Sequence, residues 1–231
     1  MSLMIGCDVG ERNGGGADTL AAEPPPSDVA GAPAAGDSTV VDDRAVVLFM
    51  GTSLTAGRGL PLEQSFPMIV ADSLAAHGLP YRVVNAGVSG ETSSGALRRM
   101  DWVLSQPVEI LVLETGANDM LRGGSPEALE DNLQAIVDRV RSERPETAII
   151  LAGMRAMPNL GAAYVADFEE VYPRVAQRND LTLIPFLLDG VAGNAEMNLA
   201  DGIHPNPEGQ HLVAANVLET LVPVLEADVA R

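Results

Sequence analysis

Five short, largely apolar runs recur between residues 45 and 184. They alternate little with polar residues, which is typical of strands buried on both faces of a parallel sheet. The sequence therefore predicts five buried strands, at residues 45–50, 81–85, 109–114, 147–153 and 181–184.

Stretches with apolar residues at helical spacing separate these runs or follow the last of them. The spacing predicts helices over residues 66–76, 95–104, 126–143, 162–177 and 207–225. Ser125 is a favourable N-cap and Pro126 a favourable first residue for the third helix, whereas Pro173 should kink or break the fourth. Strands that alternate with helices imply right-handed βαβ units, and so an α/β fold with helices on both faces of a parallel sheet.

The N-terminal part of the chain has a different composition. Residues 8–43 are rich in Gly, Ala, Pro and Asp and show no periodic apolar pattern, as in a flexible linker. We expect residues 1–43 to form a tether and residues 44–231 to form one folded domain. The run that ends at Gly6-Cys7 loosely resembles the end of a bacterial lipoprotein signal. A lipid anchor at Cys7 and a free cysteine in the tail both remain open.

The composition of the chain argues against nucleic acid, anionic membranes and Cys-bound zinc as partners. The chain of 231 residues has a formal charge of −18, and all of its basic residues are Arg. Such an acidic surface disfavours binding to nucleic acid and docking on anionic membranes. A single cysteine excludes an internal disulfide and a Cys-based zinc site. No apolar run reaches the length of a transmembrane helix, so we expect membrane contact only through a lipid anchor at Cys7.

Candidate chemistry lies where the predicted strands end, because ligands of open parallel sheets bind beyond the carboxyl ends of the strands. Small, polar segments follow three strands, and another precedes the last predicted helix. Of the three histidines, His77 lies at a helix end and His211 within a helix, whereas His204 lies in a loop three residues after Asp201. A carboxylate at that spacing can orient an imidazole for proton transfer. These segments are residues 51–57, 86–92, 116–119 and 201–205.

The order of four motifs is more specific than any one of them. Gly-x-Ser-Leu at residues 51–54, Gly90, Gly-x-Asn-Asp at residues 116–119 and Asp-x-x-His-Pro at residues 201–205 follow one another along the chain. This order resembles the four blocks of the SGNH, or GDSL, hydrolase family over about residues 45–225. The most similar subgroup is the bacterial periplasmic acyl-thioesterase, lysophospholipase and arylesterase type. The resemblance implies a three-layer α/β/α, flavodoxin-like fold with a central parallel sheet of about five strands.

The resemblance also implies roles for individual residues. Ser53 resembles the nucleophile, and Asp201 and His204 resemble the other members of a catalytic triad. The backbone N–H groups of Ser53 and Gly90 and the side-chain amide of Asn118 resemble the oxyanion hole. Such an enzyme needs no metal and no cofactor.

Segments beside these residues are candidates for substrate contact. We expect the loops after the third and fourth strands to border the site, with Met120, Leu121, Arg122, Met157 and Pro158 as substrate-binding residues. Core packing is the simpler interpretation for Met154 and Met197.

The first motif departs from the family in one residue. The usual sequence is Gly-Asp-Ser, and this chain has Thr52 in place of the Asp. Thr offers a hydrogen bond without a charge, so we expect activity to survive with altered loop stability or pH response.

Three functions follow as hypotheses. The first is a serine esterase acting on carboxylic esters or thioesters, of arylesterase, acyl-thioesterase or lysophospholipase type. The second is a carbohydrate O-acetylesterase on the same fold. The third is a non-catalytic envelope binding protein. We expect a periplasmic or envelope-associated location, and a cytoplasmic one stays open.

Overall fold

A computed structural model describes residues 42–229. Its centre is a five-stranded, fully parallel sheet with strand order β2-β1-β3-β4-β5. The strands are β1 (Ala45–Gly51), β2 (Tyr81–Gly87), β3 (Ile110–Glu114), β4 (Ala148–Ala152) and β5 (Thr182–Ile184). The predicted α/β class, the five strands and their parallel arrangement are confirmed.

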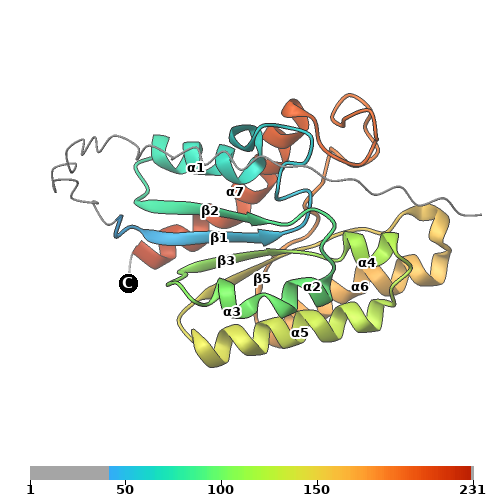
Figure 1. Ribbon diagram of the computed structural model, residues 1–231, viewed down its shortest axis with the longest axis horizontal. Coiled ribbons are helices and arrows are strands. Elements are labelled where there is room, and N and C mark those ends of the chain that lie inside the picture. Colours follow the sequence, from blue (N-terminus) through green and yellow to red (C-terminus); the bar gives the residue numbers. More distant parts are fainter. Residues whose placement is uncertain (1–41, 230–231) are drawn as a thin grey trace, which may run out of the picture. The chain divides into compact units, whose positions relative to one another are not determined.

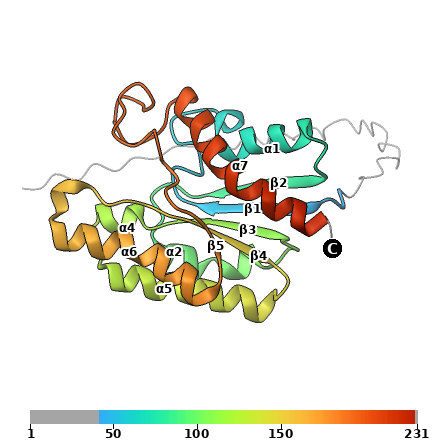
Figure 2. The same cartoon turned by 180° about the vertical axis from the view of Figure 1, so that it is seen from behind.

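Helices cover both faces of this sheet, which gives the predicted three layers. Figures 1 and 2 show α1 and α7 on one face and α2, α3, α5 and α6 on the other. The α-helices are α1 (Phe66–Ala76), α2 (Ser93–Arg98), α3 (Met100–Val103), α4 (Ala117–Leu121), α5 (Pro126–Glu143), α6 (Ala162–Asn179) and α7 (Pro207–Val229). Two short 3₁₀ helices, η1 (Leu62–Gln64) and η2 (Pro158–Leu160), lie in the loops after β1 and β4.

The core lies between the sheet and its two helical layers. The central strands β1 and β3 are almost fully buried, as their continuous apolar runs predict. On one face the ring of Phe49 meets that of Phe66 from α1 edge-on, with ring centroids 5.6 Å apart. Because every strand points the same way, all five carboxyl ends meet at one edge, the right-hand edge of the sheet in Figure 1.

Three helix predictions need correction. Residues 95–104 do not form one helix, because the chain is divided at Arg99, whose backbone (φ −99°, ψ 11°) departs from helical geometry. Pro173 does not end α6, which runs on to Asn179. Pro173 is exposed, so water can donate to the Glu169 carbonyl, which has no helical donor because proline lacks a backbone N–H. The last helix extends past Leu225 to Val229.

Several predictions fall on parts of the chain that the structure does not describe. Cys7 and residues 1–41 of the predicted tether lie outside residues 42–229, so the lipid anchor stays a prediction. Within the described range, no helix is long and apolar enough to cross a membrane.

Candidate active site

Ser53 lies in a tight turn directly after β1. The carbonyl of Thr52 accepts a hydrogen bond from the Ala56 N–H, and that of Ser53 accepts one from the Arg58 N–H, both at 3.0 Å. These bonds fold residues 52–58 back on themselves, so the Ser53 side chain is held at the carboxyl edge of the sheet. Ser53 is buried, with 8% of the residue exposed.

His204 and Asp201 come from the long segment between β5 and α7. The imidazole Nε2 of His204 is 2.9 Å from the Ser53 Oγ, and its Nδ1 is 2.7 Å from the Asp201 Oδ2. The three residues predicted as a triad therefore form one continuous hydrogen-bonded chain. A bridge between Asn198 and Pro205, with the Leu199 N–H on the His204 carbonyl at 2.8 Å, fixes the loop that carries the imidazole.

The Asp201 carboxylate has donors besides the imidazole. Its Oδ1 accepts the backbone N–H groups of His204 and Ile203, both at 3.0 Å. Hydrogen bonds from these two N–H groups and from the His204 ring hold the pKa of the Asp201 carboxyl well below its usual range. Asp201 is therefore ionised at neutral pH and can hold an N–H proton on the His204 Nδ1, leaving Nε2 free to accept one.

Two of the three proposed oxyanion donors have no hydrogen-bond acceptor within the described residues. Among residues 42–229, the backbone N–H groups of Ser53 and Gly90 have no hydrogen-bond acceptor. Gly90 has φ +82°, a conformation that side chains disfavour, so glycine suits this position. The amide of Asn118, on α4, donates to the Glu91 carbonyl at 2.9 Å. An amide nitrogen carries two N–H groups, so this bond orients the side chain and leaves one donor available.

A buried carboxyl that the sequence motifs did not indicate lies beneath the turn that carries Ser53. Glu114, the last residue of β3, is 1% exposed and accepts hydrogen bonds from the backbone N–H and hydroxyl groups of Thr52 and Thr55, at 2.7–3.4 Å. Burial raises the pKa of Glu114, and these hydrogen bonds act in the opposite direction. An Asp in place of Thr52 would put a second carboxyl beside it, whereas Thr52 supplies a donor. The one signal in the sequence was a Glu ending an apolar strand.

Asp119, the last residue of the Gly-x-Asn-Asp motif, is hydrogen-bonded to Ser93. Its two carboxylate oxygens accept the backbone N–H of Ser93 at 2.8 Å and the Ser93 hydroxyl at 2.6 Å. The Gly-x-Asn-Asp motif thereby joins α4 to the start of α2, the helix that follows Gly90. Asn118 and Gly90 are positioned together by this contact.

The predicted substrate-binding residues fall into two groups. Met120 is buried at 7% exposure, and its sulfur accepts the Met157 N–H at 3.2 Å, so it packs between the two loops. Leu121, Arg122 and Pro158 are exposed. The structure thus gives Met120 and Met157 packing contacts, and it leaves the other three side chains accessible near the same edge.

Within the described part of the chain, no three His, Cys, Asp or Glu side chains lie close enough together to hold a metal ion. His77 follows α1 and its Nδ1 lies 2.7 Å from the Ser73 carbonyl, and His211 lies on α7.

Comparison with known proteins places this geometry in a family. The model of the GDSL-like lipase/acylhydrolase family matches residues 49–212. The chain belongs to the GDSL-like lipase/acylhydrolase family. Membership of the GDSL-like family makes it a carboxylic ester hydrolase, as the order of its motifs predicts.

Named relatives of the GDSL-like family cover most of the chain. It is 39% identical to the esterase TesA of Pseudomonas aeruginosa over 180 residues, which are 78% of this chain and 89% of the relative. It is 36% identical to an arylesterase of Vibrio mimicus, over 76% of this chain and 88% of the relative. It is 33% identical to thioesterase 1/protease 1/lysophospholipase L1 of Escherichia coli K12, over 79% and 86%.

Solved structures of the same family share the fold. The crystal structure of TesA superposes with a TM-score of 0.73 over 77% of this chain and 98% of that one. The SGNH-hydrolase esterase AlinE4, 36% identical, superposes with a TM-score of 0.65 over 79% and 97%. The SGNH hydrolase fold implied by the sequence motifs is therefore confirmed.

Proposed function

We propose that this chain hydrolyses acyl esters and thioesters through a covalent intermediate on Ser53. The observation that carries the proposal is the hydrogen-bonded chain from Ser53 through His204 to Asp201, at 2.9 and 2.7 Å. Among residues 42–229, the backbone N–H groups of Ser53 and Gly90 have no acceptor and are therefore available to an oxyanion. A nucleophile, a base, a group that orients the base and oxyanion donors are the four parts that acyl transfer requires.

The reaction follows from these positions. As the Ser53 oxygen bonds to the ester carbonyl carbon, His204 Nε2 takes the hydroxyl proton, and Asp201 stabilises the resulting imidazolium. The carbonyl oxygen becomes an oxyanion that accepts hydrogen bonds from the proposed donors. When the carbonyl reforms, the bond to the alcohol or thiol breaks and His204 protonates this leaving group. Water then attacks the acyl-Ser53 ester by the same route, releasing the acid and restoring Ser53.

Apolar side chains around the edge support an acyl substrate. Six large hydrophobic residues are well exposed within residues 42–229, and five of them lie in segments that follow a strand or precede α7. These five lie at the carboxyl side of the sheet, where the acyl chain of a substrate bonded to the Ser53 Oγ would run. They are Leu62, Val88, Leu121, Leu160 and Ile203.

A panel of substrates tests the proposal. We expect hydrolysis of 4-nitrophenyl esters and of acyl thioesters, with kcat/KM rising as the acyl chain lengthens over the apolar edge. In Ser53→Ala, turnover of the whole panel should fall by about 10⁵–10⁶-fold with the fold intact by circular dichroism. Activity confined to acetyl groups would favour a carbohydrate O-acetylesterase. No turnover of any ester or thioester by the folded wild-type chain would refute the proposal.

A further inference from the structure

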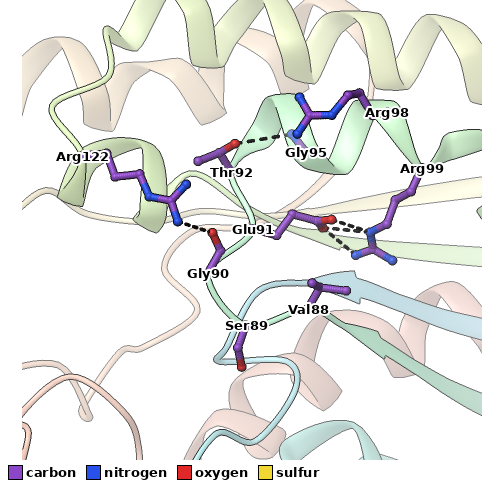
Figure 3. Close-up of a pocket in the computed structure, with 9 residues that line it drawn as sticks. All are labelled: Val88, Ser89, Gly90, Glu91, Thr92, Gly95, Arg98, Arg99 and Arg122. Carbon is purple, nitrogen blue, oxygen red and sulfur yellow. Dashed lines mark hydrogen bonds and ion pairs between the residues drawn. The ribbon is translucent and has the colours of Figure 1, made fainter. Parts of the chain in front are cut away.

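A hollow on the surface lies directly beside Gly90, one of the proposed oxyanion donors. It has a volume of about 470 Å³. Figure 3 shows that it is bordered by residues 88–92, by Arg98 and Arg99 from the end of α2 and by Arg122 from the end of α4. No residue of the triad lines this hollow, and Val88 is the one exposed apolar residue of the five that does.

The charge of the lining contrasts with that of the chain. Three arginines and one glutamate, Glu91, line the hollow, which gives a formal charge of 3 − 1 = +2 in a chain of −18. Arg99 is the arginine that Glu91 neutralises, through an ion pair of 2.7 Å whose side chains are 18% and 10% exposed. Arg98 and Arg122 therefore supply the excess of positive charge.

These two guanidinium groups have no carboxylate partner within residues 42–229. Arg122 donates to the Gly90 carbonyl at 2.7 Å, and Arg98 donates to the Ser94 hydroxyl at 3.3 Å. A guanidinium has five N–H groups, so each keeps several donors for an anion. Three other exposed arginines, Arg58, Arg141 and Arg155, also have no carboxylate partner in that range, but they do not line the hollow. Three more exposed arginines each form an ion pair with a carboxylate. They are Arg44 with Asp42, and Arg174 and Arg178 with Glu130.

The backbone keeps the hollow open at the point between its charged groups. A Cβ atom on Gly95 would lie 2.8 Å from the Glu91 Cγ and 3.6 Å from the Arg98 Nη2. A side chain at position 95 would therefore enter the space that Arg98 and Glu91 border. Glycine in the first turns of α2 leaves the guanidinium of Arg98 accessible from this space.

We propose that Arg98 and Arg122 form a subsite for an anionic oxygen group, a phosphate or carboxylate, carried by the ester substrate. This inference rests on the proposed function, because the hollow adjoins Gly90 and thus the position of the reacting carbonyl. The planar forks of two guanidinium groups match the oxygens of such anions. The subsite determines which ester is preferred, and it takes no part in breaking the ester bond. The anion can belong to the acyl group or to the leaving group.

Two matched pairs of substrates separate these sources. On the acyl side, 4-nitrophenyl hexanoate is compared with mono-4-nitrophenyl adipate, which has the same chain length and ends in a carboxylate. On the leaving-group side, phenyl butyrate is compared with 4-(butyryloxy)phenyl phosphate. The readout is the ratio of kcat/KM for the anionic ester to that for its neutral partner. Because both values come from one preparation, partial loss of folded enzyme cancels in this ratio.

The variants are Arg98→Gln and Arg122→Gln, with Arg44→Gln as the matched control. Arg44 is exposed at the opposite end of β1, so its variant changes the net charge equally without touching the hollow. We expect the ratio to fall about tenfold in each subsite variant, which is about 1.4 kcal/mol, and to stay unchanged in the control. The wild-type ratio should also fall in about 0.5 M NaCl, because salt screens the attraction.

The outcomes distinguish the two proposals. A tenfold fall in one pair supports the subsite and shows which side of the ester carries the anion. Equal ratios in wild type, both subsite variants and the control, for both pairs, would overturn the subsite while neutral esters still turned over. Failure of the wild-type chain to hydrolyse any of the four esters would instead overturn the proposed function, and the subsite with it.

Discussion

The buried carboxyl of Glu114 should hold the turn that carries Ser53 in place. One of its oxygens, Oε2, accepts the Thr52 N–H at 2.7 Å, the Thr55 hydroxyl at 2.9 Å and the Thr55 N–H at 3.4 Å. Thr52 immediately precedes Ser53 along the chain. Replacing Glu114 with Leu leaves these three donors without their acceptor in a site that is closed to water.

The cost can be estimated from the groups left without a partner. A buried donor that loses its acceptor costs about 1–3 kcal/mol, and the short bond to the Thr52 N–H is the least replaceable. With the Thr55 hydroxyl and the weaker Thr55 N–H bond added, Glu114→Leu should lower the free energy of unfolding by about 2–5 kcal/mol. A shift of about 1 Å in the Ser53 oxygen would also lower kcat/KM by about 100-fold.

Glu114→Gln is the matched comparison, because its amide oxygen can replace Oε2 and its amide nitrogen can donate to the Thr52 hydroxyl. The pKa of Glu114 is raised, so its neutral form is favoured in the folded state. The stability that it contributes is complete below the ordinary value of about 4.5 and is lost as the pH rises through the folded pKa. The stability of Glu114→Gln relative to wild type should therefore improve as the pH rises from 4.5.

Urea unfolding at about pH 4.5 and pH 8, together with kcat/KM on one neutral ester, measures these effects. If Glu114→Leu fails to fold, Thr55→Val removes a single hydroxyl donor and should cost about 0.5–1.5 kcal/mol. A loss below about 1 kcal/mol in Glu114→Leu, with kcat/KM at the wild-type level, would refute the assigned role.

Three further predictions concern the neighbouring groups. Asn118→Ala should lower kcat about 10²–10³-fold while leaving the melting temperature near wild type, and an unchanged kcat would remove Asn118 from the oxyanion hole. Asp201→Asn should lower kcat about 10⁴-fold. Because the pKa of Asp201 is lowered, its contribution to stability is present above about pH 3.8 and lost as the pH falls, so the stability gap between Asp201→Asn and wild type should narrow in acid. Asp119→Ala should cost about 1–3 kcal/mol by leaving the Ser93 N–H and hydroxyl without their acceptor, and thermal unfolding at wild-type temperature would contradict this role.

The sheet was predictable because strands buried on both faces appear in the sequence as continuous apolar runs. Strand β1 (Ala45–Gly51) matches its apolar run almost residue for residue. Helix boundaries were less predictable, since they depend on contacts between segments far apart in sequence. The chain is divided at Arg99, whose side chain pairs with Glu91 and donates to the Gly51 carbonyl at 3.4 Å. No periodicity in residues 95–104 contains that information.

Some residues of the candidate site were also predictable from the sequence, and others were not. Ser53, His204 and Asp201 were predictable because the order of the motifs and the direction of the strands bring them to one edge. Glu114 was not, because its role depends on the register that sets the end of β3 beneath the turn after β1. The hollow beside Gly90 was not predictable as a whole. Arg122 was expected to contact substrate, but Arg98 looks in sequence like an ordinary surface charge, and only the packing of α2 beside the end of α4 brings both arginines to one hollow.

The identity of the nucleophile is tested most directly by covalent trapping. The folded chain is treated with a fluorophosphonate, and the modified residue is located by mass spectrometry of the intact protein and of its peptides. We predict a single adduct, on Ser53, with hydrolysis lost in proportion to labelling and no adduct in folded Ser53→Ala. An adduct on another residue, or full hydrolysis by Ser53→Ala, would contradict the account.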